Sequence, residues 1–380
     1  MSGNRRIVFI DLFRSAVILL MLEGHLLRAL LDPLLQGSAF FHLHEFVHGL
    51  SAPAFLFGAG LTFVISTRHR WHDYRRWGEP LSRRIRRLLL IYALGIGLHL
   101  PFLSIRKIMI DSMPSDILQL FACDVLHCIG IGLLVLHLLV MLFRTETGFF
   151  AAVGGAVAAI GFCTPFIWDL HIPAAGPWFA QMINGYRGSP FPVFPYLGFM
   201  FAGVLVARGY LRSAEGAGET AFAVRLFFAG SVLVFAGMLA DFLPFSYYPV
   251  YNYWFTSPNY FIIRLGSLLI LFVIFRALGT GDRFTGRLFT VLGAESLFVY
   301  VLHLAVLYGT VLNPEFNLQA VIGASLGIIP AFCLLGLFVG GMLVCALGWH
   351  YLKTERRWLY RTIQLAAGAG FLLVFFLRDF

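Results

Sequence analysis

Residues 7–29 read IVFIDLFRSAVILLMLEGHLLRA, an apolar stretch of the length that a helix needs to cross a lipid bilayer. A signal peptide also begins with an apolar run. This one is too long, contains Asp11, Arg14 and Glu23, and has no small-residue cleavage site. We therefore interpret it as a retained first transmembrane helix that carries ionisable side chains.

Ten further apolar stretches follow along the chain. They cover residues 49–66, 86–103, 117–141, 149–167, 192–209, 224–243, 259–278, 288–311, 319–349 and 359–377. The chain is 59% hydrophobic and 12% charged, whereas a soluble domain has about 25% charged residues. The pattern predicts an all-α, polytopic transmembrane helix bundle of about eleven spans, with residues 1–380 as a single domain. Ten and twelve spans are the alternatives, because the tenth stretch is long for one span and contains Pro330.

The positive charge predicts how the chain is oriented. If the N-terminus is cytoplasmic, the alternate connecting segments on that side hold most of the 28 Lys and Arg residues. The net charge of +9 is therefore assigned to topology and to contact with anionic lipid rather than to nucleic acid. We expect a multi-pass protein of a bacterial inner membrane, with the lipid bilayer as a partner and oligomerisation left open.

Placing an ionisable side chain inside a membrane costs free energy, so we expect those of the first helix to have a structural or functional role. Asp11 and Arg14 are one turn apart and can form a structural ion pair. Arg14 and His25 are eleven residues apart, which places them on one stripe of a helix with a rise of about 16 Å. Such a stripe could hold a long ligand with an anionic end, and His25 could act as a general base. Glu23 is expected to face elsewhere.

A second group of histidines precedes the second span. Residues 44–48 read HEFVH, the pattern in which two histidines bind zinc and a glutamate activates water. The catalytic candidates here are His44, Glu45 and His48. A zinc site needs a third protein ligand. Glu315 is only a weak candidate for that ligand, so no metal is predicted.

Two further patterns are candidate binding sites. Tyr300 and His303 are one turn apart within a span and could share a site or make an ordinary interhelical hydrogen bond. Arg83, Arg86 and Arg87 belong to a run that could bind phosphates or could only fix topology.

Several blocks together resemble the transmembrane acyltransferase superfamily, which includes acyltransferase-3 proteins and heparan-α-glucosaminide N-acetyltransferase-like bacterial proteins. The spacing Arg14-x10-His25 is similar to the first-helix signature of the acyltransferase-3 branch. Four further blocks follow in family order, and they are His48–Gly60, Asp124–Gly130, Phe194–Gly198 and Ser296–His303.

The resemblance implies transfer of an acyl group, usually acetyl, from cytoplasmic acyl-CoA to an acceptor on the far side. Acetyl-CoA would be a cosubstrate, with no permanently bound cofactor. The position of Arg14, with Asp11 beside it, and the basic inner face would hold the nucleotide, and His25 would be the base. Two departures stand out: the family's usual Arg-Gly is Arg14-Ser15 here, and the heparan-type branch has its catalytic histidine between helices one and two.

We therefore expect an acyltransferase that modifies a hydroxyl or an amine of an extracytoplasmic glycan or related molecule. The second departure leaves His42, His44 and His48 as alternative bases. A transporter of a hydrophobic or acylated solute is the main alternative function. A zinc-dependent membrane hydrolase is the other.

Overall fold

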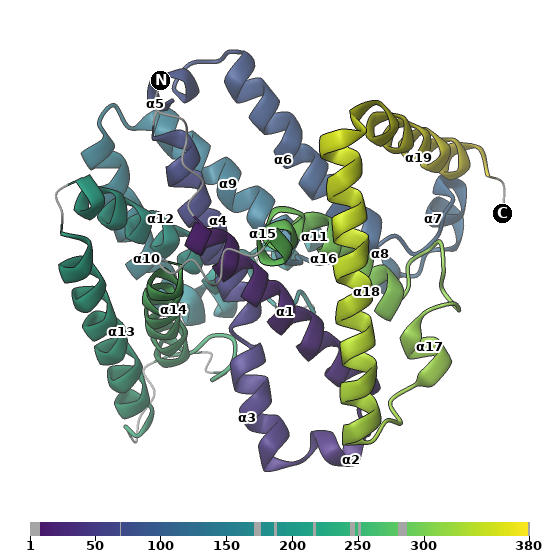
Figure 1. The fold of residues 1–380 in the computed structure, drawn as a ribbon, viewed down its shortest axis with the longest axis horizontal. Coiled ribbons are helices and arrows are strands. Elements are labelled where there is room, and N and C mark those ends of the chain that lie inside the picture. Colours follow the sequence, from purple (N-terminus) through teal and green to yellow (C-terminus); the bar gives the residue numbers. More distant parts are fainter. Residues whose placement is uncertain are drawn as a thin grey trace. The chain divides into compact units, whose positions relative to one another are not determined.

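The computed structural model describes residues 8–68, 70–170, 176–185, 188–215, 218–243, 248–249, 252–279 and 287–378. Within these ranges the regular structure is helical, apart from an isolated parallel bridge between Leu31 and Leu326. The prediction of an all-α, polytopic helix bundle is confirmed (Figure 1).

The chain folds into two compact units, each made of segments that are distant in sequence. The first unit comprises Met1–Ser51, Leu98–Ile117 and Phe275–Phe380, and the second comprises Ala52–Gly97 and Leu118–Ile274. This division into two units does not decide whether residues 1–380 form a single domain, so the single domain stays a prediction.

The first unit holds nine of the labelled helices. These are α1 (Val8–Leu30), α2 (Pro33–Gln36), α3 (Ala39–His48), α7 (Ile105–Asp111), α15 (Arg287–Ala294), α16 (Ser296–Leu307), α17 (Leu318–Ile322), α18 (Ile328–Glu355) and α19 (Arg357–Leu377). The second unit holds α4 (Ser51–Thr67), α5 (Trp71–Tyr74), α6 (Glu79–Leu98), α9 (Val125–Leu142), α10 (Glu146–Asp169), α11 (Gly176–Ile183), α12 (Val193–Glu215), α13 (Glu219–Asp241) and most of α14 (Pro258–Leu278). Helix α8 (Pro114–Leu120) crosses the sequence boundary.

Eight helices of the described chain are long and apolar enough to cross a membrane, and a ninth span forms if the bent pair α15–α16 is counted. All eleven predicted stretches contain a helix. The difference in number arises because α1 and α6 are too rich in charged side chains to pass the same test. Charges that an isolated span would not tolerate are accommodated when the helix packs against protein.

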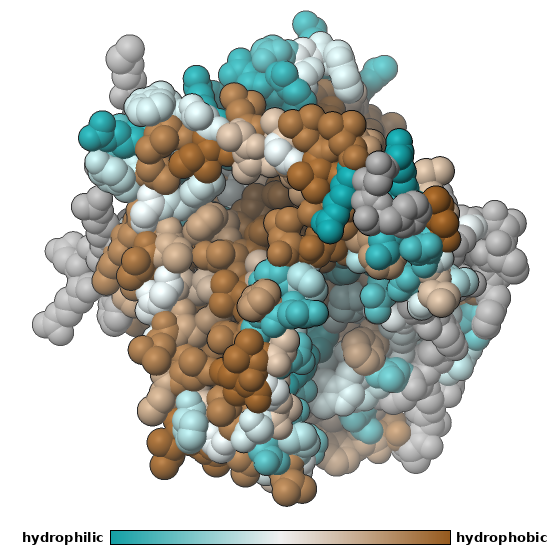
Figure 2. Space-filling view, turned by 90° about the vertical axis from the view of Figure 1, so that its right-hand side faces the viewer, coloured by the Kyte–Doolittle hydropathy of each residue, from teal (hydrophilic) through white to brown (hydrophobic). Residues whose placement is uncertain are grey.

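Much of the apolar side-chain surface points outward. Leu337 of α18 is 74% exposed and Leu365 of α19 is also 74% exposed. Figure 2 shows broad hydrophobic areas on one face of the molecule. Large exposed apolar areas mark surfaces that meet lipid or protein. Together with the apolar helices, they make this an integral membrane protein.

Two local predictions are corrected. Pro330 does not divide the tenth span, because α18 begins at Ile328 and a proline is tolerated in the first turn of a helix. The segment 39–48, predicted as part of a loop, is the helix α3, which begins where the Ser38 side chain accepts a hydrogen bond from the Phe41 backbone.

Helix α1 forms the centre of the first unit. It contacts α3, α15, α16, α17 and α18. Ile18, Leu22, Leu26 and Leu30 recur every four residues and are all fully buried, as expected of one face of a helix. Burying a side chain of this size stabilises the fold by about 1.5–3 kcal/mol. This packed face fixes where the polar side chains of α1 point.

An ion-pair network connects the bend between α15 and α16 to α18. Glu295 lies at this bend of 80°, and its side chain is 4% exposed. Its carboxylate accepts bonds from Lys353 Nζ, at 3.0 Å to each oxygen, and lies 2.8 Å from His350 Nδ1. A buried carboxylate needs such partners. The network therefore holds the first turn of α16 in place.

Candidate functional site

Three histidines from three helices meet inside the first unit. The ring of His25, on α1, lies 5.6 Å from the ring of His48 at the end of α3 and 5.2 Å from the ring of His303 on α16. His48 and His303 are buried, and His25 is half-buried. Sequence reasoning predicted all three residues, but as members of separate motifs.

Tyr308, the residue after α16, sets the orientation of His25. The Tyr308 hydroxyl donates to the backbone carbonyl of His25 over 3.2 Å and lies 3.2 Å from His25 Nδ1. A hydroxyl has one proton to donate. A hydroxyl that donates to the carbonyl accepts from Nδ1, and this arrangement satisfies both contacts at once. We infer that Nδ1 carries the ring proton and that Nε2 keeps its lone pair.

The other two histidines have the same arrangement. His48 Nδ1 lies 3.3 Å from the Leu20 carbonyl, and His303 Nδ1 lies 3.1 Å from the Val299 carbonyl. A carbonyl oxygen can only accept, so each Nδ1 donates. All three imidazoles thus keep Nε2 as a hydrogen-bond acceptor. Among the described residues, Nε2 of His303 is buried without a partner. The cluster can therefore accept a proton or a donor group.

A glycine on α1 makes room for His48. A Cβ atom at Gly24 would lie 1.7 Å from Nδ1 of His48. Atoms cannot approach that closely, so any larger residue at position 24 would displace the imidazole. The small residue before His25 is therefore part of the site, because it lets α3 approach α1.

The two acidic residues near the cluster have partners that sequence reasoning did not predict. Glu45 pairs with Arg28, at 2.7 Å, instead of acting with the two histidines of its motif. His44 lies 2.7 Å from Glu23, and its ring stacks on His48 at 6.1 Å. Glu23 thus faces α3 rather than the stripe of Arg14 and His25, and α3 brings His44 to it.

Arg14 and His25 lie on the same face of α1, as the helical spacing predicted. Arg14 donates to Oγ of Ser296, the first residue of α16, over 2.7 Å. His25 meets His303 and Tyr308 at the other end of that helix. The two helices thus form a polar seam with a cation at one end and imidazoles at the other.

The remaining predicted residues of the first unit lie along or near this seam. Tyr300 is 9% exposed, and its ring lies 5.5 Å from that of His303. Asp11 is buried, and its carbonyl is the atom that a Cβ at Gly293 would meet at 2.6 Å. Helices α1 and α15 therefore approach closely at Asp11.

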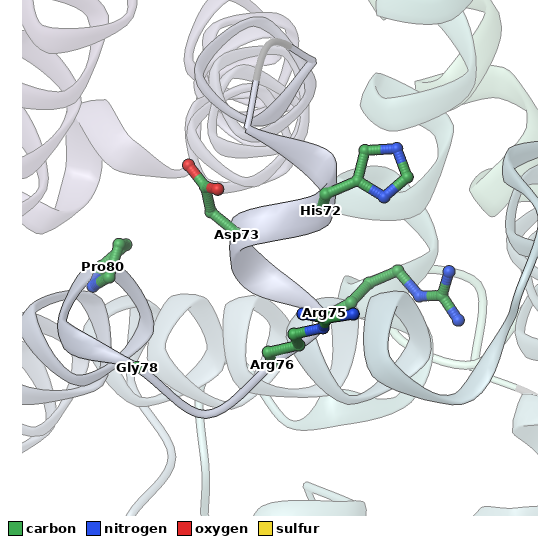
Figure 3. Close-up of a pocket in the computed structure, with 6 residues that line it drawn as sticks. All are labelled: His72, Asp73, Arg75, Arg76, Gly78 and Pro80. Carbon is green, nitrogen blue, oxygen red and sulfur yellow. The ribbon is translucent and has the colours of Figure 1, made fainter.

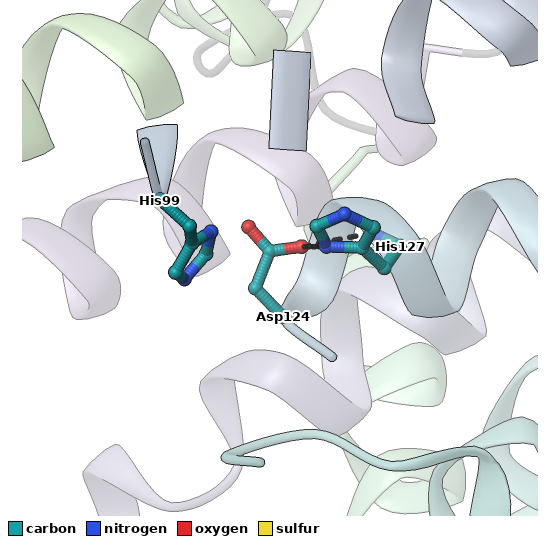
Figure 4. A group of neighbouring side chains, drawn as sticks. All are labelled: His99, Asp124 and His127. Carbon is teal, nitrogen blue, oxygen red and sulfur yellow. Dashed lines mark hydrogen bonds and ion pairs between the residues drawn. The ribbon is translucent and has the colours of Figure 1, made fainter. Parts of the chain in front are cut away.

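In the second unit, the block at Asp124 has a structural role. The Asp124 carboxylate accepts from the backbone N–H of His127 over 2.8 Å and lies 2.7 Å from its Nδ1 (Figure 4). The aspartate therefore caps the N-terminus of α9 and orients a buried histidine. The two residues of the block thus contact each other through both the backbone and the side chain of His127.

The predicted phosphate-binding arginines lie on exposed parts of α6. Arg83 and Arg86 share the carboxylate of Glu79, at 3.1 Å and 3.2 Å. The segment before α6 surrounds an open pocket of about 620 Å³, where Figure 3 places His72 and Arg75 among the lining residues.

A different pocket of the second unit has the chemistry to hold an anion. Its volume is about 280 Å³. The lining includes the cations Arg68, Arg208 and Arg212 and the aromatic rings of Trp71 and Phe149. Sequence reasoning assigned these arginines to topology alone. Arg208 and Arg212 are one turn apart on α12, but Arg68 lies about 140 residues earlier in the chain, so no local signal placed the three in one pocket.

The comparison with known proteins gives the site its context. The family model described as "Heparan-alpha-glucosaminide N-acetyltransferase, catalytic" matches residues 6–250, which is more than half of the chain. The match includes His25, His44 and His48, whereas His303 and Tyr308 lie beyond it. A search of curated proteins finds no match. The chain belongs to the heparan-alpha-glucosaminide N-acetyltransferase catalytic family of transmembrane acetyltransferases.

Proposed function

We propose that this protein transfers an acetyl group from acetyl-CoA on the cytoplasmic side of the membrane to a hydroxyl or amine of an extracytoplasmic glycan or related acceptor. The supporting observation is the cluster of three imidazoles on α1, α3 and α16, in a chain of an acetyltransferase family. An acyl transfer to a hydroxyl needs a base, and a neutral imidazole with an open Nε2 is a suitable one.

In the proposed mechanism, Nε2 of His25 takes the proton of the acceptor O–H or N–H as the acceptor attacks the thioester carbonyl. The new C–O or C–N bond forms, the C–S bond breaks, and the thiolate leaves and takes up a proton as free CoA. Tyr308 keeps the proton of His25 on Nδ1, so that the catalytic lone pair stays on Nε2. His48 is the alternative base, because it has the same tautomer.

The donor is proposed to lie along the seam between α1 and α16. Its anionic end would be near Arg14, and its thioester would be near His25. Arginine is suited to phosphate because its planar N–H groups bind two oxygens at once. Asp11, Tyr300 and His303 would line the path of the donor within the first unit. Phosphate binding by Arg83, Arg86 and Arg87 of the second unit stays a separate proposal.

The proposal is tested by transfer of labelled acetyl. Purified protein in lipid nanodiscs is incubated with acetyl-CoA that carries a labelled acetyl group and with candidate glycan acceptors. Label should appear in the acceptor, with one free CoA released for each acetyl transferred. Binding of acetyl-CoA without transfer to any acceptor would contradict the proposal and would favour a transporter.

Replacing Arg14 with glutamine should weaken donor binding. A lost charge-assisted hydrogen bond costs about 1.5–3 kcal/mol, so we expect the KM for acetyl-CoA to rise roughly 10- to 100-fold. The KM for the acceptor should stay unchanged. Arg28→Gln is the matched control, since Arg28 is on the same helix but pairs with Glu45. An equal rise of the KM for acetyl-CoA in both variants would contradict the proposal that Arg14 binds the donor.

Replacing Tyr308 with phenylalanine should lower kcat about tenfold and leave both KM values unchanged, because one hydrogen bond of roughly 1.4 kcal/mol orients the base but does not bind substrate. Steady-state kinetics with each substrate varied in turn measures this separation. Tyr351→Phe, at an exposed tyrosine of α18, is the control. If the Tyr308 variant instead raised KM at constant kcat, the hydroxyl would contact substrate and would not be a positioning group.

A further inference from the structure

A groove of about 490 Å³ opens between α1 and α3 of the first unit. Its apolar walls include Leu20, Phe40, Leu43 and Val47. The last three are exposed, at 71%, 65% and 44%. These side chains present an apolar, open groove to the surroundings of the two helices.

The polar side chains in the groove are Glu23 and His44. Oε2 of Glu23 and Nδ1 of His44 are buried and have no hydrogen-bond partner among the residues that the structure describes. His44 Nε2 lies 2.7 Å from Glu23 Oε1. The angle at this contact does not allow a hydrogen bond, so Nε2 has no hydrogen-bond partner either. Buried polar atoms are rarely left unpaired. A carboxylate accepts only, so its missing partner must be a donor.

The groove lies next to the imidazole cluster, because His44 belongs to its lining and contacts His48. His44 stacks on His48 at 6.1 Å, and His48 lies 5.6 Å from His25. A molecule whose polar end reached Glu23 and His44 would therefore lie one ring away from the cluster. This position suits the acceptor of the proposed reaction, whose nucleophile is itself a hydroxyl or an amine.

We propose that the groove binds an amphiphilic acceptor, with an alkyl chain between α1 and α3 and a hydroxyl- or amine-bearing head at Glu23 and His44. The inference rests on the proposed function and narrows its acceptor class to a lipid-linked molecule. The hydrocarbon tail of an ordinary lipid would leave the two polar side chains without a donor. A free, fully hydrophilic sugar would gain nothing from the apolar walls.

The first test compares two acceptors that differ only in the tail. Wild-type protein in nanodiscs is given labelled acetyl-CoA with octyl glucoside, below its micelle concentration, or with methyl glucoside. We expect kcat/KM to be at least tenfold higher for octyl glucoside, because each buried methylene contributes about 0.8 kcal/mol. Val47→Trp fills the groove and should reduce this ratio severalfold. Ala39→Trp, on an exposed part of the same helix outside the groove, should keep it.

The second test does not depend on activity. A dodecylamine that carries a photoreactive diazirine on its tail should crosslink to the peptide that contains Leu43 and Val47. An excess of octyl glucoside should compete with it, and an excess of phosphatidylcholine, whose head group has no hydroxyl or amine proton to donate, should not. Val47→Trp should abolish the crosslink.

The two proposals fail in different ways. Equal transfer to octyl and methyl glucoside, or competition by phosphatidylcholine, would overturn the groove assignment while leaving the acetyltransferase proposal intact. Absence of transfer to every acceptor, with the crosslink still competed by octyl glucoside, would overturn the proposed function and leave the amphiphile site standing.

Discussion

Replacing His25 with alanine is expected to lower kcat for acetyl transfer by about 10²- to 10⁴-fold, the usual contribution of a positioned general base. The imidazole lies where three helices of the first unit meet and has its tautomer set by Tyr308. The measurement is single-turnover transfer of labelled acetyl under saturating acetyl-CoA, which isolates the chemical step from donor binding.

The matched control is His42→Ala. His42 is on α3, two residues from His44, but it is exposed, so its loss should change the rate less than twofold. His48→Ala distinguishes the two candidate bases. If the His48 variant loses the larger part of the rate and the His25 variant loses little, the base is His48 and the assignment of His25 is refuted.

The fold class could be predicted because it depends on composition and on the length of the apolar stretches. Helix α1 ends at Leu30, one residue beyond the predicted end, and the geometric relation of Arg14 to His25 follows from helical periodicity alone. The loop predicted before the second span was the main error. The residues from Ala39 to His48 precede the stretch that was counted as the second span, but contact with α1 stabilises them as a helix.

The site could be predicted only in part, because it depends on contacts between distant segments. His25 and His303 were each predicted from their own motifs, but nothing local indicates that α1 packs on α16, almost 280 residues later in the chain. Tyr308 gave no signal because it lies outside any motif. The partner of Glu23 could not be predicted, because periodicity describes one helix and cannot show which neighbour approaches it.

The largest effect on stability is expected for a glycine far from the histidines. In the second unit, a Cβ at Gly60 of α4 would lie 2.0 Å from the Met200 carbonyl oxygen of α12, and a Cβ at Gly203 would lie 2.1 Å from the Phe57 carbonyl oxygen. The two backbones are in direct contact, as occurs where small residues pack membrane helices closely. A backbone carbonyl cannot turn aside as a side chain can, so a larger residue must separate the helices.

Gly60→Leu should therefore lower the free energy of unfolding by more than about 4 kcal/mol, the size of effect that follows severe overpacking of a core. Monodisperse yield and thermal stability in detergent measure the loss. Gly340→Leu on α18 is the control, because a Cβ there would meet nothing within 4 Å. Since α18 faces outward at that point, its variant should melt close to the wild type. If the Gly60→Leu variant melted at the same temperature as the Gly340→Leu variant, α4 and α12 would not pack through these glycines. The proposed close contact between the two helices of the second unit would then be wrong.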